Sequence, residues 1–189
     1  MDRPELVAVL LTVASGAAAQ DLSDLANEVG RAVELPAHKT LIDEVVAKDA
    51  ELSEFTTDGC SGGMSSVWKY IAANFPKFAD VHSNEPPWAD CCVAHDRDYH
   101  HAGGAKYAEA SFDARLLSDE NLRNCVEATA DRRKKSLAEA YDTDEATVIE
   151  TYDAIAAAMF HSVRLGGGPC SGLPWRWGYG YPQCPTIFD

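Results

Sequence analysis

Two adjacent cysteines, Cys91 and Cys92, constrain the fold of this chain more than any other feature of its sequence. They open the segment CCVAHDRDY, which ends at Tyr99 and reads as part of a helix over about residues 88–101. Successive residues of a helix point in directions about 100° apart, so disulfides from both cysteines would fix two faces of one helix. Such a helix must lie between two other parts of the chain.

The same segment carries groups that can do chemistry. Residues four apart share a helical face, so Cys91, His95 and Tyr99 form one stripe, and Cys92 and Asp96 form the neighbouring one. The imidazole is a candidate base, and the carboxylate is a candidate metal ligand. A zinc site built on the two cysteines and the histidine is a poor alternative, because adjacent cysteines diverge and no second ligand pair completes a tetrahedral set.

The cysteine count suits a disulfide-bonded protein if the compartment is oxidising, and the N-terminal segment indicates which compartment it is. There are six cysteines, an even number typical of three bridges: Cys60, Cys91, Cys92, Cys125, Cys170 and Cys184. An apolar run that ends in an Ala-x-Ala site predicts a signal peptide over residues 1–19 and a secreted mature chain, extracellular or periplasmic, over 20–189. A mature N-terminal helix is the alternative. That run is too short to be a comfortable membrane span, and no other segment is long and apolar enough to span.

The composition limits the classes of molecule that the chain is expected to bind. The chain has 189 residues, of which 46% are hydrophobic, and this suits one domain. Its net charge is −14, and an acidic surface repels phosphate backbones. We therefore expect no nucleic-acid partner, and no tight electrostatic binding to strongly anionic membranes.

The pattern of apolar residues predicts a mainly α fold. We expect extra helices near the N-terminus over 21–35 and 38–55, a short helix over 65–75, an irregular segment over 76–88, a helix over 107–129, and one from Asp142, with Glu145 completing a capping box, to Val163. The glycines at 166–168 end that helix, and the Gly- and Pro-rich tail from Pro169 onward cannot be helical.

The tail is also rich in aromatic residues: Trp175, Trp177, Tyr179 and Tyr181. They predict either an interfacial patch at the depth of lipid headgroups or packing against the helices, and packing is the favoured interpretation. His100 and His101 are expected to be exposed at the end of their helix, where its dipole favours a cation.

A disulfide from each of the two adjacent cysteines would place another part of the chain beside Asp96 or His95. If Cys92 bonds Cys60, the Gly-rich loop DGCSGG (residues 58–63) is held one turn from Asp96. Inward-turned carbonyls beside a carboxylate are hard oxygen donors, which is the ligand type of a calcium site.

The other bridge would bring a second carboxylate to the histidine. If Cys91 bonds Cys125, an antiparallel helix pair follows. His95 is then about 6 Å past Cys91, and Asp119 is about 9 Å before Cys125, so the two are nearly level. Asp113 would lie about 18 Å back, which is too far. Asp119 is therefore the expected partner of His95.

The segments CCVAHDRDY, DGCSGG and SDENLRNC together resemble the secreted phospholipase A2 family, whose active-site helix carries CCxxHDxxY. The resemblance covers about residues 58–126. It implies a phospholipase A2-like domain with an antiparallel pair of active-site helices. It also implies the bridges Cys60–Cys92 and Cys91–Cys125, which would leave Cys170 and Cys184 to close the tail.

The resemblance further implies roles for residues. His95 would be the general base that takes a proton from water, Asp119 would orient its ring, and Tyr99 would hydrogen-bond to Asp119. The Ca²⁺ ligands would be the Asp96 carboxylate and three loop carbonyls, from Gly59, Ser61 and Gly63. The implied reaction is calcium-dependent hydrolysis of the sn-2 ester of a glycerophospholipid at a membrane or micelle interface.

One departure and two alternatives accompany this interpretation. The segment between Cys60 and Cys91 is longer than in the family's best-known members, and it is a candidate lid or rim of the site. A catalytically inactive, secreted calcium- or lipid-binding module on the same fold is one alternative. A structural secreted protein, in which DGCSGG is only a turn, is the other.

Overall fold

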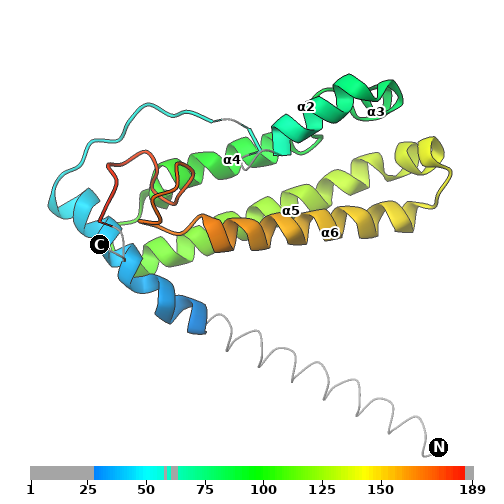
Figure 1. Ribbon diagram of the computed structural model, residues 1–189. Coiled ribbons are helices and arrows are strands. Elements are labelled where there is room, and N and C mark those ends of the chain that lie inside the picture. The colour runs from blue at the N-terminus through cyan, green and yellow to red at the C-terminus, as the bar shows by residue number, and fades with distance from the viewer. Residues whose placement is uncertain (1–27, 58, 61–63, 186–189) are drawn as a thin grey trace, which may run out of the picture.

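The computed structural model of this chain describes residues 28–57, 59–60 and 64–185 (Figure 1). The expected signal peptide over 1–19 lies outside these residues. The elements are a helix over 28–42 that continues into η1 (Asp43–Ala47), then α2 (Met64–Asn74), α3 (Pro76–His82), α4 (Ala89–His100), η2 (Ala102–Gly104), α5 (Ala108–Tyr141) and α6 (Glu145–Gly166). The described residues form no strand, and the mainly α class is confirmed for this part of the chain. No helix within it has the length and apolar character that crossing a membrane requires.

The two longest helices, α5 and α6, form an antiparallel hairpin (Figure 1). Apolar side chains from both helices make its core: Leu122, Val126, Ala130 and Leu137 on α5, and Val148, Tyr152, Ala156 and Met159 on α6. Neighbouring members of each set are three, four or seven residues apart, so they face one side of each helix. Removing such side chains from water, at about 25 cal/mol per Å², is the main stabilisation of the hairpin.

The turn between these helices differs from the expected capping box. Asp142 has a φ of 51° and ends α5 in the left-handed region, with its N–H bonded to Ala138. Asp144 is the residue that caps α6, because its side chain accepts a hydrogen bond from the Thr147 N–H at 2.8 Å. Asp142 therefore terminates one helix, and Asp144 starts the next two positions later.

Helix α4 runs antiparallel to α5. The pairs that meet step down α5 as they step up α4: Cys91 with Cys125, His95 with Asp119, and Tyr99 with Arg115. This register places the side chains of His95 and Tyr99 against one face of α5.

Residues 76–88 were expected to be irregular, and this prediction is wrong for their first half. Pro76 occupies the first turn of α3, where its missing N–H costs nothing. Trp68 of α2 packs edge-on against Phe78 at 4.9 Å and against Trp88 at 5.4 Å, and Trp88 in turn packs on Tyr152 of α6 at 5.6 Å. This aromatic cluster fastens α2 and α3 to the hairpin.

The N-terminal region contains one continuous helix over 28–47 in place of the two expected helices, and residues 50–57 have no regular secondary structure. The Ser53 N–H bonds to the Gly180 carbonyl at 2.8 Å, and the Thr56 carbonyl accepts from the Tyr179 hydroxyl at 2.7 Å. The tail therefore provides the hydrogen-bond partners of the Ser53 N–H and the Thr56 carbonyl, which a helix would have paired within itself. The prediction of a helix as far as residue 55 is wrong because of these contacts with the tail.

The tail is irregular, as expected, and it packs on α4. Trp177 is fully buried, donates from Nε1 to Ser111 Oγ at 2.9 Å, and meets Tyr99 edge-on at 5.0 Å. His100 is 3% exposed, which corrects the expectation of an exposed residue. Gly180 covers it so closely that a Cβ there would lie 2.5 Å from the His100 ring.

Candidate active site

Three disulfides fix the parts of the site. They join Cys60 to Cys92, Cys91 to Cys125, and Cys170 to Cys184, with Cα–Cα distances of 5.0, 5.8 and 5.2 Å. The pairing agrees with the one implied by the resemblance. One face of α4 is thus tied to the loop that contains Cys60, and the next face is tied to α5.

A buried histidine–aspartate pair lies between α4 and α5. His95 Nε2 is 2.8 Å from Asp119 Oδ1, and the two residues are 7% and 0% exposed. Asp113, the rival partner, is exposed and pairs instead with Arg31 at 2.5 Å. Because an ionised carboxylate only accepts hydrogen bonds, Nε2 carries the proton and Nδ1 keeps its lone pair. Nδ1 is therefore the nitrogen that can accept a proton.

Two further donors hold the Asp119 carboxylate. The Tyr99 hydroxyl donates to Oδ1 at 2.7 Å, and Arg164 Nη1 donates to Oδ2 at 3.0 Å. Burial raises the pKa of Tyr99 well above its ordinary range, so the hydroxyl keeps its proton and remains a donor. Asp119 is thus held through both of its carboxylate oxygens.

Arg115 and Glu34 lie behind the Tyr99 and Arg164 side chains that hold this carboxylate. The guanidinium of Arg115 donates to the Tyr99 hydroxyl at 3.2 Å and to Glu34, while Arg164 Nη2 donates to Glu34 Oε1 at 2.6 Å. Burial acts to lower the pKa of Arg115, but the neighbouring Tyr99, Asp119 and Glu34 raise it above its ordinary value. Arg115 is therefore a permanent cation, although its side chain is fully buried.

Sequence reasoning missed Glu34, Arg115 and Arg164. None of them belongs to a recognisable motif. The only signal for Arg164 was its place directly after Val163, where a predicted helix ends, which is an ordinary position for a cation. Its role becomes visible only when α6 is placed beside α5.

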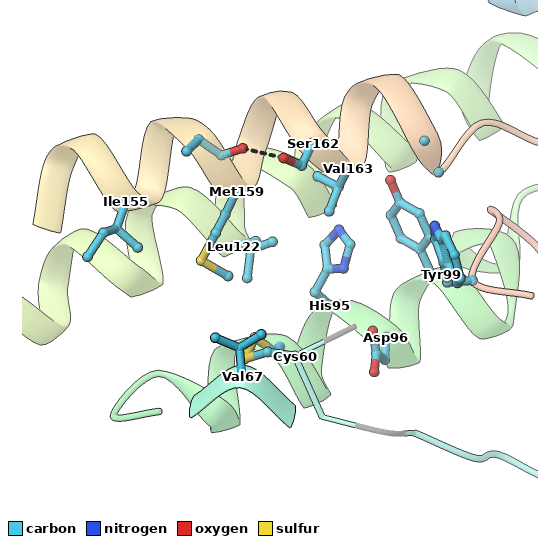
Figure 2. Close-up of a pocket in the computed structure, with 15 residues that line it drawn as sticks. Cys60, Val67, His95, Asp96, Tyr99, Leu122, Ile155, Met159, Ser162 and Val163 are labelled. Carbon is cyan, nitrogen blue, oxygen red and sulfur yellow. Dashed lines mark hydrogen bonds between the residues drawn. A yellow bond between two sulfur atoms is a disulfide. The ribbon is translucent and has the colours of Figure 1, made fainter. Parts of the chain in front are cut away.

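His95 opens onto a cavity of about 620 Å³, a size typical of ligand pockets. Figure 2 shows its imidazole rising from α4 toward α6, with Leu122 and Met159 on one side and Tyr99 on the other. The wall is largely apolar and is contributed by α2, α5, α6 and the tail: Val67, Leu122, Ile155, Met159, Val163 and Trp175. The expected rim role of the segment after Cys60 has this support, since Val67 of α2 lines the cavity.

Asp96 lies at the polar end of the same cavity. Its Oδ2 accepts a hydrogen bond from Thr57 Oγ1 at 2.5 Å, and Thr57 Oγ1 also accepts from the Gly59 N–H at 3.0 Å. Through Thr57 and the Cys60–Cys92 bridge, the start of the loop is held against the carboxylate.

The oxygen atoms available around Asp96 fit a calcium ion by their chemistry. A carboxylate, a hydroxyl and main-chain carbonyls are all hard oxygen ligands. Ser61 and Gly63, two of the three predicted carbonyl donors, lie outside the described residues, and their role stays a prediction. In the part of the chain that the structure describes, no three His, Cys, Asp or Glu side chains gather as a metal cluster. A site at Asp96 would therefore depend on the loop backbone.

Comparison of the chain with protein-family models, with curated proteins and with solved structures found no match. The chemistry must therefore be argued from the site itself. The site combines a buried imidazole with one nitrogen held by a carboxylate, an apolar cavity beside that imidazole, and the oxygen atoms of Asp96 and Thr57.

Proposed function

We propose that this chain is a secreted, calcium-dependent hydrolase of the phospholipase A2 type, which cleaves the sn-2 ester of glycerophospholipids. One observation carries the proposal: the His95–Asp119 pair is buried and opens onto an apolar cavity that has the Asp96 carboxylate at its edge. The antiparallel α4–α5 pair, joined by Cys91–Cys125, supports the likeness to the phospholipase A2 helix pair. The three disulfides support secretion, because such bridges persist in oxidising compartments.

The chain's residues would carry the reaction through one proton relay. Nδ1 of His95 takes a proton from a water molecule, whose oxygen attacks the ester carbonyl carbon. Asp119 stabilises the imidazolium that forms. The bond from the carbonyl carbon to the glycerol oxygen then breaks, and the imidazolium returns its proton to that oxygen. The products are a fatty acid and a lysophospholipid.

Asp96 and the loop around Cys60 would hold the calcium ion. When bound, calcium supplies Lewis-acid polarisation of the ester carbonyl and balances the negative charge on its oxygen. The chain contributes the anionic ligand, and the Cys60–Cys92 bridge keeps the loop within reach of it.

The cavity supports a substrate with a long apolar chain. Leu122, Ile155 and Met159 offer a surface to an acyl chain, and among the described residues that line the wall only Asp96 carries a formal charge. A small, water-soluble ester would leave most of this surface in contact with water, so binding would favour a lipid.

The experiment uses phosphatidylcholine vesicles labelled in the sn-2 acyl chain or, separately, in the sn-1 chain. We expect release of the sn-2 label alone. Ala158→Phe, which places a ring at the cavity wall, should raise KM, whereas Ala154→Phe, on an exposed position of α6 outside the wall, should not. Equal release of both labels, or equal effects of both variants, would contradict the proposal.

A catalytically inactive calcium- or lipid-binding module remains a second candidate, and one observation favours it. Arg164 binds Asp119 at 3.0 Å, and a guanidinium so close reduces the negative charge that His95 would feel. The candidates are separated by vesicle binding measured together with fatty-acid release. Binding without release, in the presence of calcium, would favour the module.

A further inference from the structure

We propose that the helix over 28–42 completes the active site, because its Glu34 is a positioning residue that fixes Asp119 through two arginines. The inference rests on the proposed function and adds to it residues outside the motif. Glu34 lies far from the CCVAHDRDY segment in sequence, but it reaches the same carboxylate by two routes.

The first route passes through Arg164. Glu34 Oε1 accepts from Arg164 Nη2 at 2.6 Å, and Nη1 of the same guanidinium donates to Asp119 Oδ2 at 3.0 Å. A guanidinium is a rigid, planar fork, so fixing one side of it fixes the other. Glu34 therefore sets the direction from which Asp119 Oδ2 is held.

The second route passes through Arg115 and Tyr99. Glu34 Oε2 accepts from Arg115 Nη1, and Arg115 Nε donates to the Tyr99 hydroxyl at 3.2 Å. That hydroxyl donates to Asp119 Oδ1 at 2.7 Å. The two routes thus end on different oxygens of one carboxylate and close a ring of five side chains.

The ring combines four helices. Glu34 comes from the helix over 28–42, Tyr99 from α4, Arg115 and Asp119 from α5, and Arg164 from α6. The side chains of Asp119 and Arg115 are fully buried, while those of Arg164 and Glu34 are 15% and 21% exposed. Interactions between charges so far removed from water are strong, and losing one member leaves the others without compensation.

Charge balance gives Glu34 a second effect on Asp119. Glu34 pairs with both guanidinium groups. Arg164 therefore has an anionic partner besides Asp119, and Arg115, which reaches Asp119 only through Tyr99, has an anionic partner of its own. Without Glu34, Asp119 would be the only carboxylate facing Arg164 in this network. The Asp119 carboxylate would then be attracted more strongly toward Arg164 and held less firmly against His95.

A role in positioning differs from a role in substrate binding. Glu34, Arg115 and Arg164 do not line the cavity, so they should affect kcat rather than KM. The Arg31–Asp113 ion pair offers a matched control, because it joins the same helix to α5 and does not touch Asp119. The control pair reports how kcat responds when a contact between these two helices is lost without any change at Asp119.

The test compares ester hydrolysis by Glu34→Gln, Glu34→Asp and Asp113→Asn at saturating calcium. We expect Glu34→Gln to lower kcat by roughly 10- to 100-fold with little change in KM, since a small misplacement of a catalytic group has effects of this size. Glu34→Asp, which keeps the charge, should recover part of the rate, and Asp113→Asn should match wild type. An unchanged kcat in Glu34→Gln, or an equal loss in Asp113→Asn, would overturn the proposal.

A second readout does not depend on turnover. The ¹⁵N chemical shifts of the His95 ring report which nitrogen carries the proton in the neutral form. We expect the Nε2–H tautomer alone in wild type and a mixture in Glu34→Gln, because the acceptor that selects the tautomer is no longer fixed. If wild type releases no fatty acid but Glu34→Gln still shows the mixed tautomer, the proposed function is refuted and the positioning role stands.

The milder variant Arg164→Lys covers the case in which Glu34→Gln does not fold. Lysine keeps the charge but cannot hold Asp119 and Glu34 with a planar fork. We expect a folded protein with a lowered kcat and a mixed tautomer. A wild-type tautomer and kcat in Arg164→Lys would overturn the proposal.

Discussion

Gly167 lies directly against the ring of Tyr99, so that a Cβ at this position would be 2.6 Å from Cε1 and 2.9 Å from the hydroxyl. The same Cβ would be 2.7 Å from the Val163 carbonyl, which cannot easily move because it belongs to α6. A side chain at position 167 would therefore collide with the tyrosine whose hydroxyl donates to Asp119.

This contact makes Gly167→Ala an informative variant. The added methyl group should displace Tyr99 from Asp119, lower stability by about 1–3 kcal/mol as overpacking does, and reduce kcat. The control is Gly168→Ala, since a Cβ at Gly168 meets nothing within 4 Å. Urea unfolding and ester hydrolysis measure both effects. Equal behaviour of the two variants would mean that the contact is unimportant.

The two aspartates of α5 should differ sharply in their contribution to stability. Asp119→Asn removes the charge that Arg164 and His95 face in a buried site, so we expect a loss of about 3–5 kcal/mol in the free energy of unfolding. Asp113→Asn breaks an exposed pair with Arg31 and should cost at most about 1 kcal/mol. Urea unfolding of both variants checks the difference, and similar losses would contradict the arrangement.

Glu34 should make stability depend on pH in the acid range. Burial acts to raise its pKa, but His38, Arg115 and Arg164 outweigh burial and hold the pKa below its ordinary value of 4.5. A lowered carboxyl pKa contributes stability that is complete above 4.5 and is lost as the pH falls through the folded-state pKa.

The matched measurement is urea unfolding of wild type and Glu34→Gln over a range of pH. At neutral pH we expect wild type to be more stable by roughly 3 kcal/mol, the lower end for a buried ion pair. The gap should close on acidification, because a protonated Glu34 resembles glutamine. A gap that stays constant would show that Glu34 is not held ionised by the arginines.

Calcium should stabilise the protein through Asp96. At a calcium concentration 100 times Kd, binding adds about 2.7 kcal/mol, which raises Tm by roughly 5–10 °C for a chain of this size. Asp96→Asn should lose this shift, whereas Asp90→Asn, an exposed position in the first turn of α4, should keep it. A shift that survives in Asp96→Asn would place the metal elsewhere.

The parts of the site on one helix could be predicted from the sequence. The spacing of Cys91, His95 and Tyr99 places them on one face, and the rise per residue favours Asp119 over Asp113. Both inferences need only local geometry and a bridge to Cys125. The structure brings His95, Tyr99 and Asp119 together, although their catalytic roles stay predictions.

The parts that depend on long-range contacts could not be predicted. Residues 50–57 look helical by composition, but their backbone bonds to the tail at Gly180 and Tyr179. His100 resembles an exposed helix end, and it is buried only because Gly180 covers it. Arg164 resembles a cation placed for a helix dipole, and only the packing of α6 on α5 brings it to Asp119.

The most direct test of the account is fatty-acid release from phosphatidylcholine vesicles by the purified protein, with calcium and with excess chelator, alongside His95→Ala. We predict release by wild type that disappears with the chelator and falls at least about 100-fold in His95→Ala, because general-base catalysis contributes that much. Release that persists in His95→Ala, or no release by a folded, calcium-bound wild type, would contradict the hydrolase.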